Sequence, residues 1–512
     1  MDPIELIDDV EKRYRLYLQT TFYFRDPALR ASFAEALRSD RLSRGPYLEA
    51  TPAYRKGLSP RELFAELSSV TVEEQFLAAV QGDRPLYRHQ ERAIRRVMQG
   101  RNIVVSTGTG SGKTEAFLLP VLLHLYHEFQ RGELGPGVRA LILYPMNALA
   151  NDQRDRLGEI CGRLAQTNAR FRFTFGQYVG DTPEDERDSR RQARDRMAQR
   201  LPGELVLRSE MRESPPHILL TNYSMLEYLL LRPDDSPLFD NGMARWWTYL
   251  ILDEAHQYRG SKGTEMAMPI RRLRQRLVDG GRNLPFRCIA TSASLVRGNE
   301  DRPLVARFAS DLFGESFADD DVILGETEPI SDGSSVRLPL TAYSILRVAM
   351  TTPDIGETVR RQLRELAQMV GAPADGREDV AKIVGAILIR DARTTYLRRL
   401  ISQSPRLVEA LASEVFDDEA ADDRVKAIAD LIDLLTHAAD PETGVRLLSA
   451  RYHTFLRSLE GAFLTLWPKP VIRLDRKRDE DGLAFDLALC RECGQHYLVG
   501  RIAGEWFTEP VR

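Results

Sequence analysis

The sequence predicts an α/β protein with one parallel sheet, a helical N-terminal region and a largely α-helical C-terminal half. Short apolar runs at 102–105, 140–144 and 249–252 have the length and aliphatic content of buried strands. Longer amphipathic stretches separate them, as expected when helical crossovers join parallel strands. Each run leads directly into glycine or polar residues, and open α/β sheets hold their ligands at such strand ends.

The first of these polar segments is a glycine-rich loop. It follows the strand at 102–105 and precedes a predicted helix at 115–126, in which Pro120 would cause a kink or delay the start. Glycines let backbone N–H groups turn towards a phosphate, and the helix N-terminus adds the positive end of its dipole. Lys113 would reach the β- and γ-phosphates, and the Thr114 hydroxyl would hold Mg²⁺. The predicted phosphate-binding loop comprises Thr107, Gly108, Thr109, Gly110, Ser111, Gly112, Lys113 and Thr114, with a threonine where the general pattern has its first glycine.

Length and composition indicate a globular protein of about three domains. The 512 residues are 43% hydrophobic and 29% charged, and the net charge of −4 excludes a generally basic nucleic-acid coat while leaving local basic patches possible. No apolar run approaches the roughly 20 residues that span a bilayer, and the N-terminus lacks the apolar core of a signal peptide. Four cysteines provide no disulfide framework. We therefore expect a reduced, cytoplasmic protein without a membrane partner.

A segment that selects the nucleotide is predicted shortly before the glycine loop. Residues 85–90 open a helix that runs towards Met98. Tyr87 would stack on adenine, and the Gln90 amide would read the donor and acceptor edge of the base. We expect both residues to bind ATP.

Two further strand ends are candidates for contacts with nucleic acid, although plain strand-to-helix connections are the alternative for both. They follow the strands at 140–144 and 217–220. Backbone amides and small polar side chains at this edge suit phosphodiester contacts, which fix register without reading bases. Residues 184–212 are rich in both signs of charge and are predicted to be a solvated helical excursion rather than a nucleic-acid patch. The residues expected to contact DNA are Pro145, Met146, Asn147, Thr221, Asn222 and Tyr223.

Paired carboxylates follow the strand at 249–252. Asp253 can hold the hydration shell of Mg²⁺, while Glu254 orients and deprotonates the attacking water. His256 is placed to sense the state of the γ-phosphate. The candidate catalytic residues are therefore Glu254, Asp253, Lys113 and His256, with Thr114 and Asp253 as Mg²⁺ ligands. The strand at 286–290 ends in hydroxyl residues that can couple the carboxylates to a bound strand, namely Thr291, Ser292 and Ser294.

Taken in order, these segments resemble superfamily 2 helicases of the DEAD/DEAH-box type. The resemblance covers residues 85–300 and implies a first RecA-like lobe with the P-loop NTPase fold. Residues 86–90, 144–149 and 253–260 look like those of the MrfA/YprA-like branch. That branch and its relatives, such as DrmA, serve bacterial DNA repair and anti-phage defence. The resemblance implies ATP-driven translocation on DNA that has a single-stranded region, typically from 3′ to 5′.

A second RecA-like lobe is not recognised after residue 300. In this superfamily that lobe carries a Gln-x-x-Gly-Arg-x-x-Arg-type motif with arginine fingers, and Gln495 with Gly500 and Arg501 has the wrong spacing. We therefore expect the chain to be the N-terminal part of a longer protein or one subunit of a split one. It would act with a second lobe in cis or in trans.

The C-terminal half carries weaker signals. Residues 340–465 contain helical patterns, including 380–389 and 424–435, and the acidic run at 417–423 is predicted to be a solvated helix start. Residues 451–457 resemble a segment found between the two lobes of large defence and repair helicases. Cys490 and Cys493 are spaced like half a zinc knuckle, but a structural zinc site needs four ligands and His496 would reach the metal only in strained geometry. A reduced thiol pair in a β-turn is the equal alternative.

These observations divide the chain into four segments. We expect a helical N-terminal region at 1–80, a RecA-like ATP-binding lobe at 81–330, a helical domain at 331–470, and a partial domain with the cysteine pair at 471–512. The leading predicted function is that of the first motor lobe of an ATP-dependent DNA helicase or translocase. The alternative is an ATP-gated DNA-binding scaffold subunit with little turnover of its own.

Overall fold

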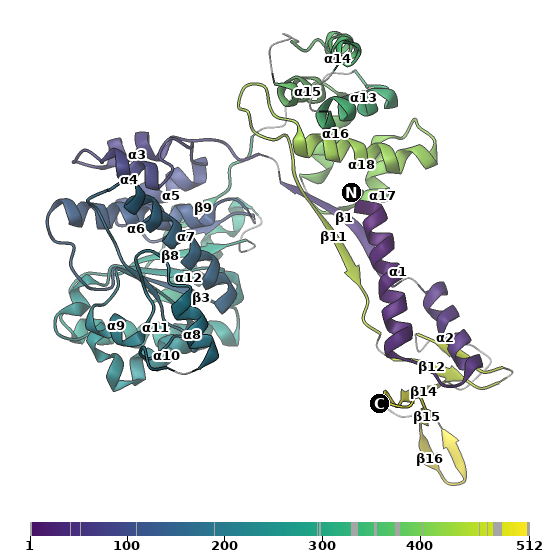
Figure 1. Ribbon diagram of the computed structural model, residues 1–512, viewed down its shortest axis with the longest axis horizontal. Coiled ribbons are helices and arrows are strands. Elements are labelled where there is room, and N and C mark those ends of the chain that lie inside the picture. The colour runs from purple at the N-terminus through teal and green to yellow at the C-terminus, as the bar shows by residue number, and fades with distance from the viewer. Residues whose placement is uncertain are drawn as a thin grey trace. The chain divides into compact units, whose positions relative to one another are not determined.

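The computed structural model describes residues 3–40, 42–51, 53–108, 110–188, 190–293, 295, 298–328, 336–352, 356–373, 379–402, 404–459, 461–467, 469–474 and 484–508 (Figure 1). Thr109 and Ser294 therefore lie outside the described residues. The chain divides into two compact units, of which one is Tyr54–Glu328 and the other combines Met1–Ala53 with Pro329–Arg512. The predicted boundaries at residues 80, 330 and 470 stay predictions.

An eight-stranded parallel sheet organises the unit Tyr54–Glu328. Its strand order is β5-β4-β6-β3-β7-β8-β2-β9. The central strands are buried along their length, as expected for a parallel sheet covered by helices on both faces. This arrangement confirms the predicted α/β fold with a parallel sheet. The strands are β2 (Ile103–Ser106), β3 (Ala140–Tyr144), β4 (Phe175–Gln177), β5 (Glu204–Leu205), β6 (Ile218–Asn222), β7 (Tyr249–Leu252), β8 (Arg287–Ser292) and β9 (Val322–Leu324).

The register of the sheet brings the predicted motif loops to one edge. Tyr144 at the end of β3 pairs with Asn222 at the end of β6, and Ser106 at the end of β2 pairs with Ser292 at the end of β8. Strand β7 lies between β3 and β8. The loops that follow these five parallel strands therefore emerge together at the carboxyl edge.

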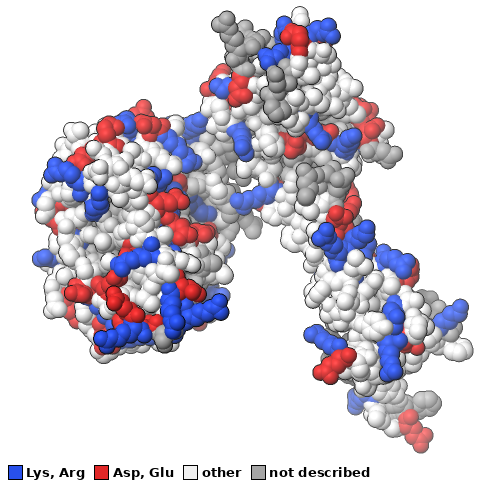
Figure 2. Space-filling model, in the orientation of Figure 1, with Lys and Arg blue, Asp and Glu red and all other residues white. Residues whose placement is uncertain are grey.

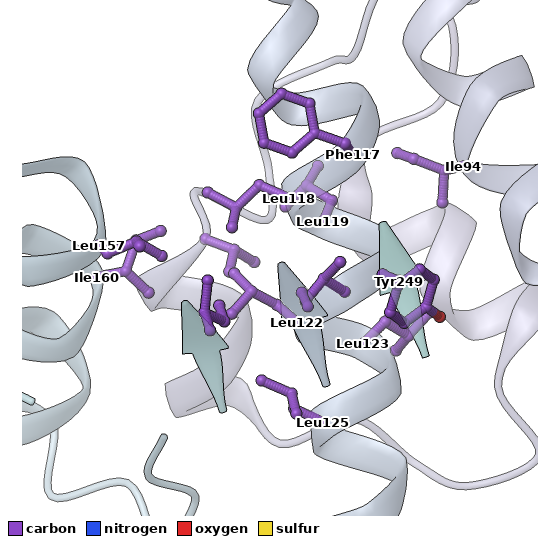
Figure 3. Close-up of a cluster of buried hydrophobic side chains, with 14 of the residues drawn as sticks. Ile94, Phe117, Leu118, Leu119, Leu122, Leu123, Leu125, Leu157, Ile160 and Tyr249 are labelled. Atoms are coloured by element: carbon purple, nitrogen blue, oxygen red, sulfur yellow. The ribbon is translucent and has the colours of Figure 1, made fainter. Parts of the chain in front are cut away.

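Helix α6 (Lys113–Gln130) forms the centre of one hydrophobic core. Figure 3 shows its leucines between Ile94 of α5 (Arg88–Met98) and Leu157 and Ile160 of α7 (Asn147–Gln166). Pro120 lies inside α6 and is buried, and the helix begins at Lys113, so the proline does not delay its start. Burial of this face offsets the backbone hydrogen bond that the proline removes. The position of α6 matters because its first residue is the lysine of the glycine loop.

The remaining helices of this unit surround the sheet (Figure 1). The described part of the predicted helical excursion at 184–212 includes two short helices, α8 and α9, on either side of β5. The other helices are α3 (Pro60–Leu67), α4 (Glu74–Ala79), α8 (Arg191–Ala198), α9 (Arg208–Glu213), α10 (Tyr223–Leu231), α11 (Ser261–Asp279) and α12 (Arg302–Phe313), with short 3₁₀ helices η1 (Pro233–Leu238), η2 (Met243–Trp246), η3 (Ala255–Gln257), η4 (Asn299–Asp301) and η5 (Asp319–Asp321).

The second unit begins with α1 (Pro3–Thr21) and α2 (Pro27–Ser39), as the helical periodicity predicts. Glycine and proline residues at 44–52 break the helical pattern and predict an extended linker. That prediction is wrong for the described part of the segment, because residues 44–51 belong to strand β1 (Ser43–Thr51). Strand β1 pairs antiparallel with β11 (Ser449–Leu456) and β10 (Arg406–Leu407). These partners lie far along the chain, so no local pattern indicates the pairing.

Helices fill most of the chain between β9 and β11. The predicted helical patterns at 380–389 and 424–435 are confirmed by α15 and α18. The acidic run leads into α18, and its first two aspartates form ion pairs with Arg337 and Arg393. The helices are α13 (Leu340–Thr351), α14 (Glu357–Val370), α15 (Val380–Ile389), α16 (Ala392–Ile401), α17 (Val408–Val415) and α18 (Ala421–His437).

Short antiparallel strands make up the last part of this unit. One sheet has the order β13-β12-β14-β15, and β16 pairs with β17 in a hairpin. Across the described residues, none of the helices combines the length and apolar character that a membrane crossing requires. The strands are β12 (Phe463–Thr465), β13 (Val471–Arg473), β14 (Ala484–Leu489), β15 (His496–Val499), β16 (Arg501–Ala503) and β17 (Trp506–Thr508).

Candidate functional site

A cavity of about 660 Å³ lies at the carboxyl edge of the parallel sheet. Its lining includes the glycine loop, the start of α6, the carboxylates after β7 and the segment before α5. The glycine loop and the carboxylates after β7 lie more than 100 residues apart in the sequence, and the fold brings them to one site. The predicted site residues that line the cavity are Tyr87, Gln90, Gly110, Gly112, Lys113, Thr114, Asp253 and Glu254.

The glycine loop is held in shape by contacts that depend on its residue types. Gly112 caps α6 with a φ of 70°, and a Cβ at this position would lie 2.3 Å from Nε2 of Gln90. Only glycine fits there without a shift of its neighbours. The hydroxyls of Thr107 and Ser111 lie 2.5 Å apart, and the Thr107 amide donates to the carbonyl of Ser292 at 3.1 Å. The threonine at the first position of the loop thus closes the loop on itself and ties it to β8.

Lys113 and Glu254 meet across the cavity. Nζ of Lys113 lies 3.6 Å from Oε1 of Glu254 and donates to the carbonyl of Thr107 at 3.4 Å. Thr114 accepts a hydrogen bond from Nε2 of Gln153, which lies on α7, at 3.1 Å. The lysine is therefore already positioned where the two predicted motifs converge.

Asp253 is a buried carboxylate with defined hydrogen bonds. Burial raises its pKa above the ordinary value, and the hydroxyl of Thr291, which donates to Oδ1, opposes that shift. The Glu254 amide also donates to Oδ1, at 3.1 Å. A buried carboxylate and the Thr114 hydroxyl are the hard oxygen ligands that Mg²⁺ takes in phosphate sites. The donor set therefore fits the metal expected with ATP.

Glu254 adopts a backbone conformation that is unusual for its residue type. Its φ is 52°, in the left-handed region, which costs of the order of 1–3 kcal/mol for a residue with a side chain. The conformation directs its carboxylate between two basic groups, since Oε2 lies 3.2 Å from Nδ1 of His256 while Oε1 faces Lys113. His256 in turn lies 3.3 Å from the hydroxyl of Ser292. Thus Thr291 contacts Asp253 and Ser292 contacts His256, while Ser294 lies outside the described residues.

The wall expected to hold adenine is an aromatic cluster. The ring of Tyr87 stacks on His89 with centroids 5.6 Å apart, and Tyr54 packs against both rings. The Gln90 amide accepts from the Tyr87 amide at 2.7 Å and donates to the carbonyl of Gly112 at 2.7 Å. Because a primary amide has two acceptor and two donor positions, one of each stays open on Gln90 for a base. The adenine contacts of Tyr87 and Gln90 stay predictions.

The two segments predicted to contact DNA lie side by side, although one of the predicted residues is buried. Nδ2 of Asn222 donates to Oδ1 of Asn147 at 2.8 Å, so the ends of β3 and β6 form one surface. Met146 and Tyr223 are 59% and 40% exposed beside this pair. Thr221 does not share the surface, because it is fully buried and its hydroxyl donates to the carbonyl of Tyr178. Pro145 is half-buried.

Charge is mixed over the lobe that carries this surface. Figure 2 shows Lys and Arg side chains beside Asp and Glu over the visible face of residues 54–328, rather than one uniformly basic face. Any attraction for DNA phosphates must therefore be local.

Cys490 and Cys493 lie in the turn between β14 and β15. The Cys490 amide donates to the carbonyl of Gln495, and backbone N–H groups of Cys493 and Glu492 lower the pKa of the Cys490 thiol. Lowered thiol pKa values favour the thiolate that binds metal. Among the described residues, however, no group of three or more His, Cys, Asp and Glu side chains is arranged to hold a metal ion. Zinc therefore stays a prediction.

Several residues of the site were missed from the sequence. His89 is fully buried, and burial lowers its pKa, so the neutral ring donates from Nε2 to the carbonyl of Ser111 at 3.0 Å. Gln153 contacts Thr114, and the Tyr54 ring packs near the loop. The position of His89 directly beside Gln90 could have indicated that His89 also belongs to the site. For Tyr54 and Gln153 the sequence carries none, because their partners are set by the tertiary fold.

The comparison with protein families agrees with this geometry. Residues 87–301 match the model of the DEAD/DEAH box helicase family. The Druantia protein DruE of Escherichia coli is 27% identical over 98% of this chain and 33% of its own length. The ATP-dependent helicase YprA of Bacillus subtilis is 31% identical over 48% of this chain and 28% of its own length.

The chain thus spans about a third or less of the length of these two curated relatives. Among solved structures, the DUF1998 helicase MrfA bound to DNA and AMPPNP is 22% identical, covers 72% of this chain and 43% of its own, and gives a TM-score of 0.38.

Proposed function

We propose that this chain, in which residues 87–301 form a DEAD/DEAH box helicase domain of the MrfA/YprA-like kind, is the first motor lobe of an ATP-dependent DNA helicase or translocase. The observation that carries the proposal is the convergence of Lys113 with Glu254, 3.6 Å apart, at the cavity behind the glycine loop. We propose that the protein acts in DNA repair or phage defence and that it is located in the cytoplasm.

The proposed chemistry divides between the two motif loops. Lys113 and the backbone amides of residues 107–112 bind the phosphates, and Thr114 with Asp253 would hold Mg²⁺. When bound, Mg²⁺ neutralises charge that develops on the phosphate oxygens. Glu254 is assigned to orient water and take its proton, since it lines the cavity beside Lys113. His256 and Ser292 link that carboxylate to β8, the strand that also carries Thr291.

DNA binding is proposed for the surface formed by Met146, Asn147, Asn222 and Tyr223. Contacts to the phosphodiester backbone depend steeply on salt, with a slope in log K of about −0.7 per phosphate on a single strand, and little on sequence. Unrelated oligonucleotides should therefore bind with similar affinity at each salt concentration. A strong sequence preference with a flat salt response would contradict the proposal.

The same titration identifies the surface. Asn147→Ala should weaken single-stranded DNA binding by about fivefold, the effect of about 1 kcal/mol for one hydrogen bond. Gln166→Ala is the matched control, because it removes an exposed amide from the opposite end of the same helix. Equal losses in both variants would mean that the end of β3 has no special part in binding.

An ATP-gated scaffold is the second candidate. It is favoured by one observation, namely that the residues described by the structure contain a single parallel sheet of this type. Such a subunit would bind ATP and DNA but hydrolyse ATP only with a partner lobe.

Cys490 and Cys493 are proposed as two of the four ligands of a zinc ion. The other two ligands would come from outside residues 1–512. Residues 1–512 alone should then hold well under one zinc per chain, since two thiolates cannot complete the tetrahedron. Elemental analysis of the wild-type chain and Cys490→Ser measures this. Full occupancy in the wild-type chain would require ligands that we have not identified.

A further inference from the structure

Strands β1 and β11 form an antiparallel ribbon with two different faces. Figure 1 shows them side by side, and their pairing runs from Ser43 with Leu456 to Thr51 with Ser449. Leu48 and Ala50 on one face belong to the hydrophobic core formed with the surrounding helices, and Tyr452 packs against that core. This inward face packs the ribbon against the helices. The described side chains of the other face are not part of this core.

The outward face carries three opposed pairs of side chains. The pairing places Arg44 opposite Phe455, Tyr47 opposite His453, and Glu49 opposite Arg451. Phe455 is 61% exposed, and both arginines are exposed. The exposed ring of Phe455, the Tyr47 ring that it contacts and the two arginines together form a mixed aromatic and basic surface.

A bulge keeps these pairs on one face. The register shifts between Arg44 and Tyr47, where Gly45 has a φ of 120° and a Cβ would lie 2.7 Å from the carbonyl of His453. The extra residue on β1 places Arg44 on the same side as Tyr47. Tyr47 then meets Phe455 edge to face, with centroids 6.0 Å apart.

The charge of this face is positive. Nε2 of His453 lies 2.6 Å from Oε2 of Glu49, so the carboxylate is engaged within the face. Arg44 and Arg451 thus contribute two exposed basic side chains to the face that carries this one carboxylate. Successive side chains on one face of a strand recur at about 6.7 Å, so Arg451, His453 and Phe455 follow one another along β11 at that interval.

We infer that the outward face of the β1–β11 ribbon binds single-stranded DNA. Bases stack on Phe455 and Tyr47, and phosphates contact Arg44 and Arg451. Aromatic rings interleaved with cations suit single strands, because every base offers a π-face, whereas a duplex keeps its bases stacked inside. The inference rests on the proposed DNA function and adds a second contact surface outside the helicase domain.

The test is fluorescence anisotropy of the full chain with single-stranded oligonucleotides, repeated on a strand of the same length in which abasic sites replace the bases. Phe455→Ala should weaken binding of the normal strand by about 5- to 160-fold, the range found when one stacking residue is removed. It should bind the abasic strand as the wild-type chain does. The double variant R44Q/R451Q should lower the salt slope by about 1.4, which is two phosphate contacts at about 0.7 each.

Matched controls come from exposed positions on helices of the same unit. Val348→Ala on α13 removes an apolar side chain that is 49% exposed, and Arg361→Gln on α14 removes an exposed arginine. Both should bind both strands as the wild-type chain does, and circular dichroism verifies that every variant is folded.

The outcomes separate this inference from the proposed function. If Phe455→Ala and R44Q/R451Q bind like the wild-type chain while Asn147→Ala loses affinity, the ribbon is not a DNA surface and the proposed function stands. The same holds if Phe455→Ala weakens binding of normal and abasic strands equally, since stacking is then excluded. A wild-type chain that binds no oligonucleotide contradicts both. Losses confined to the ribbon variants, with the base dependence given above, support the inference.

Discussion

Adding a second RecA-like lobe to residues 1–512 is expected to raise ATP turnover by about 10³- to 10⁵-fold. The described residues provide the lysine, the candidate metal ligands and the glutamate that we propose orients water, all around one cavity. Phosphoryl transfer leaves little covalent work for a protein, so its rate depends on positioning and on charge placed at the γ-phosphate. An arginine finger supplied by another domain is worth about 10³–10⁵ in turnover, or roughly 4–7 kcal/mol of barrier.

The measurement is steady-state ATP hydrolysis by purified residues 1–512, with and without single-stranded DNA, alone and with the second lobe in cis or as a partner. We expect slow hydrolysis and no duplex unwinding by the chain alone, and DNA-stimulated turnover when the lobe is present. Fast, DNA-stimulated hydrolysis by the chain alone would mean that residues 301–512 supply the missing charge.

The second large effect is expected for Glu254→Gln. Glutamine keeps the size and polarity of the side chain but cannot accept the proton of the attacking water. General-base catalysis contributes about 10²–10⁴ in rate, so turnover in the complete assembly should fall by that factor. Affinity for Mg·ATP should be preserved, because Lys113 and Asp253 are unchanged.

Glu265→Gln is the control for this variant, because it makes the same substitution at an exposed carboxylate on α11. Its turnover should equal that of the wild-type chain. Unchanged hydrolysis in Glu254→Gln would remove the glutamate from its assigned role.

The two motif loops of the candidate ATP site were predictable because the sequence pattern that specifies each loop is local. Residues 107–114 and 253–256 each follow a short buried strand, and the parallel arrangement of β2 and β7 in one sheet brings the two motifs together. The spacing of polar residues after buried strands was therefore sufficient to predict both motif loops. Helices α15 and α18 were predictable for a similar reason, since helical periodicity is visible within one segment.

Contacts between distant segments were not predictable. Segment 44–52 was predicted to be a linker because nothing near it indicates that β11 is its partner. Thr221 is a small polar residue that could contact a phosphate at the surface. Inside the fold, however, its hydroxyl donates a hydrogen bond to the carbonyl of Tyr178. In both cases the deciding partner lies outside any window in which a sequence pattern can be read.

Gln90 shows a third kind of limit. Its position before the glycine loop predicted a contact with adenine, and its amide is in fact bonded to the backbone of Gly112 and Tyr87. A single side chain can support the loop and present its open donor and acceptor to a base. Sequence position alone does not separate these two roles.

The most direct test of the central claim, that the glycine loop and the carboxylates form a nucleotide site, is a Mg·ATP titration of residues 1–512. The wild-type chain should bind, weakly but measurably, and Lys113→Ala should bind much more weakly because the loop loses the cation that reaches the phosphates. Lys262→Ala, which removes an exposed lysine from α11, should bind like the wild-type chain. Equal affinity of the wild-type chain and Lys113→Ala for Mg·ATP would contradict the central claim, because nucleotide binding would then not depend on this loop.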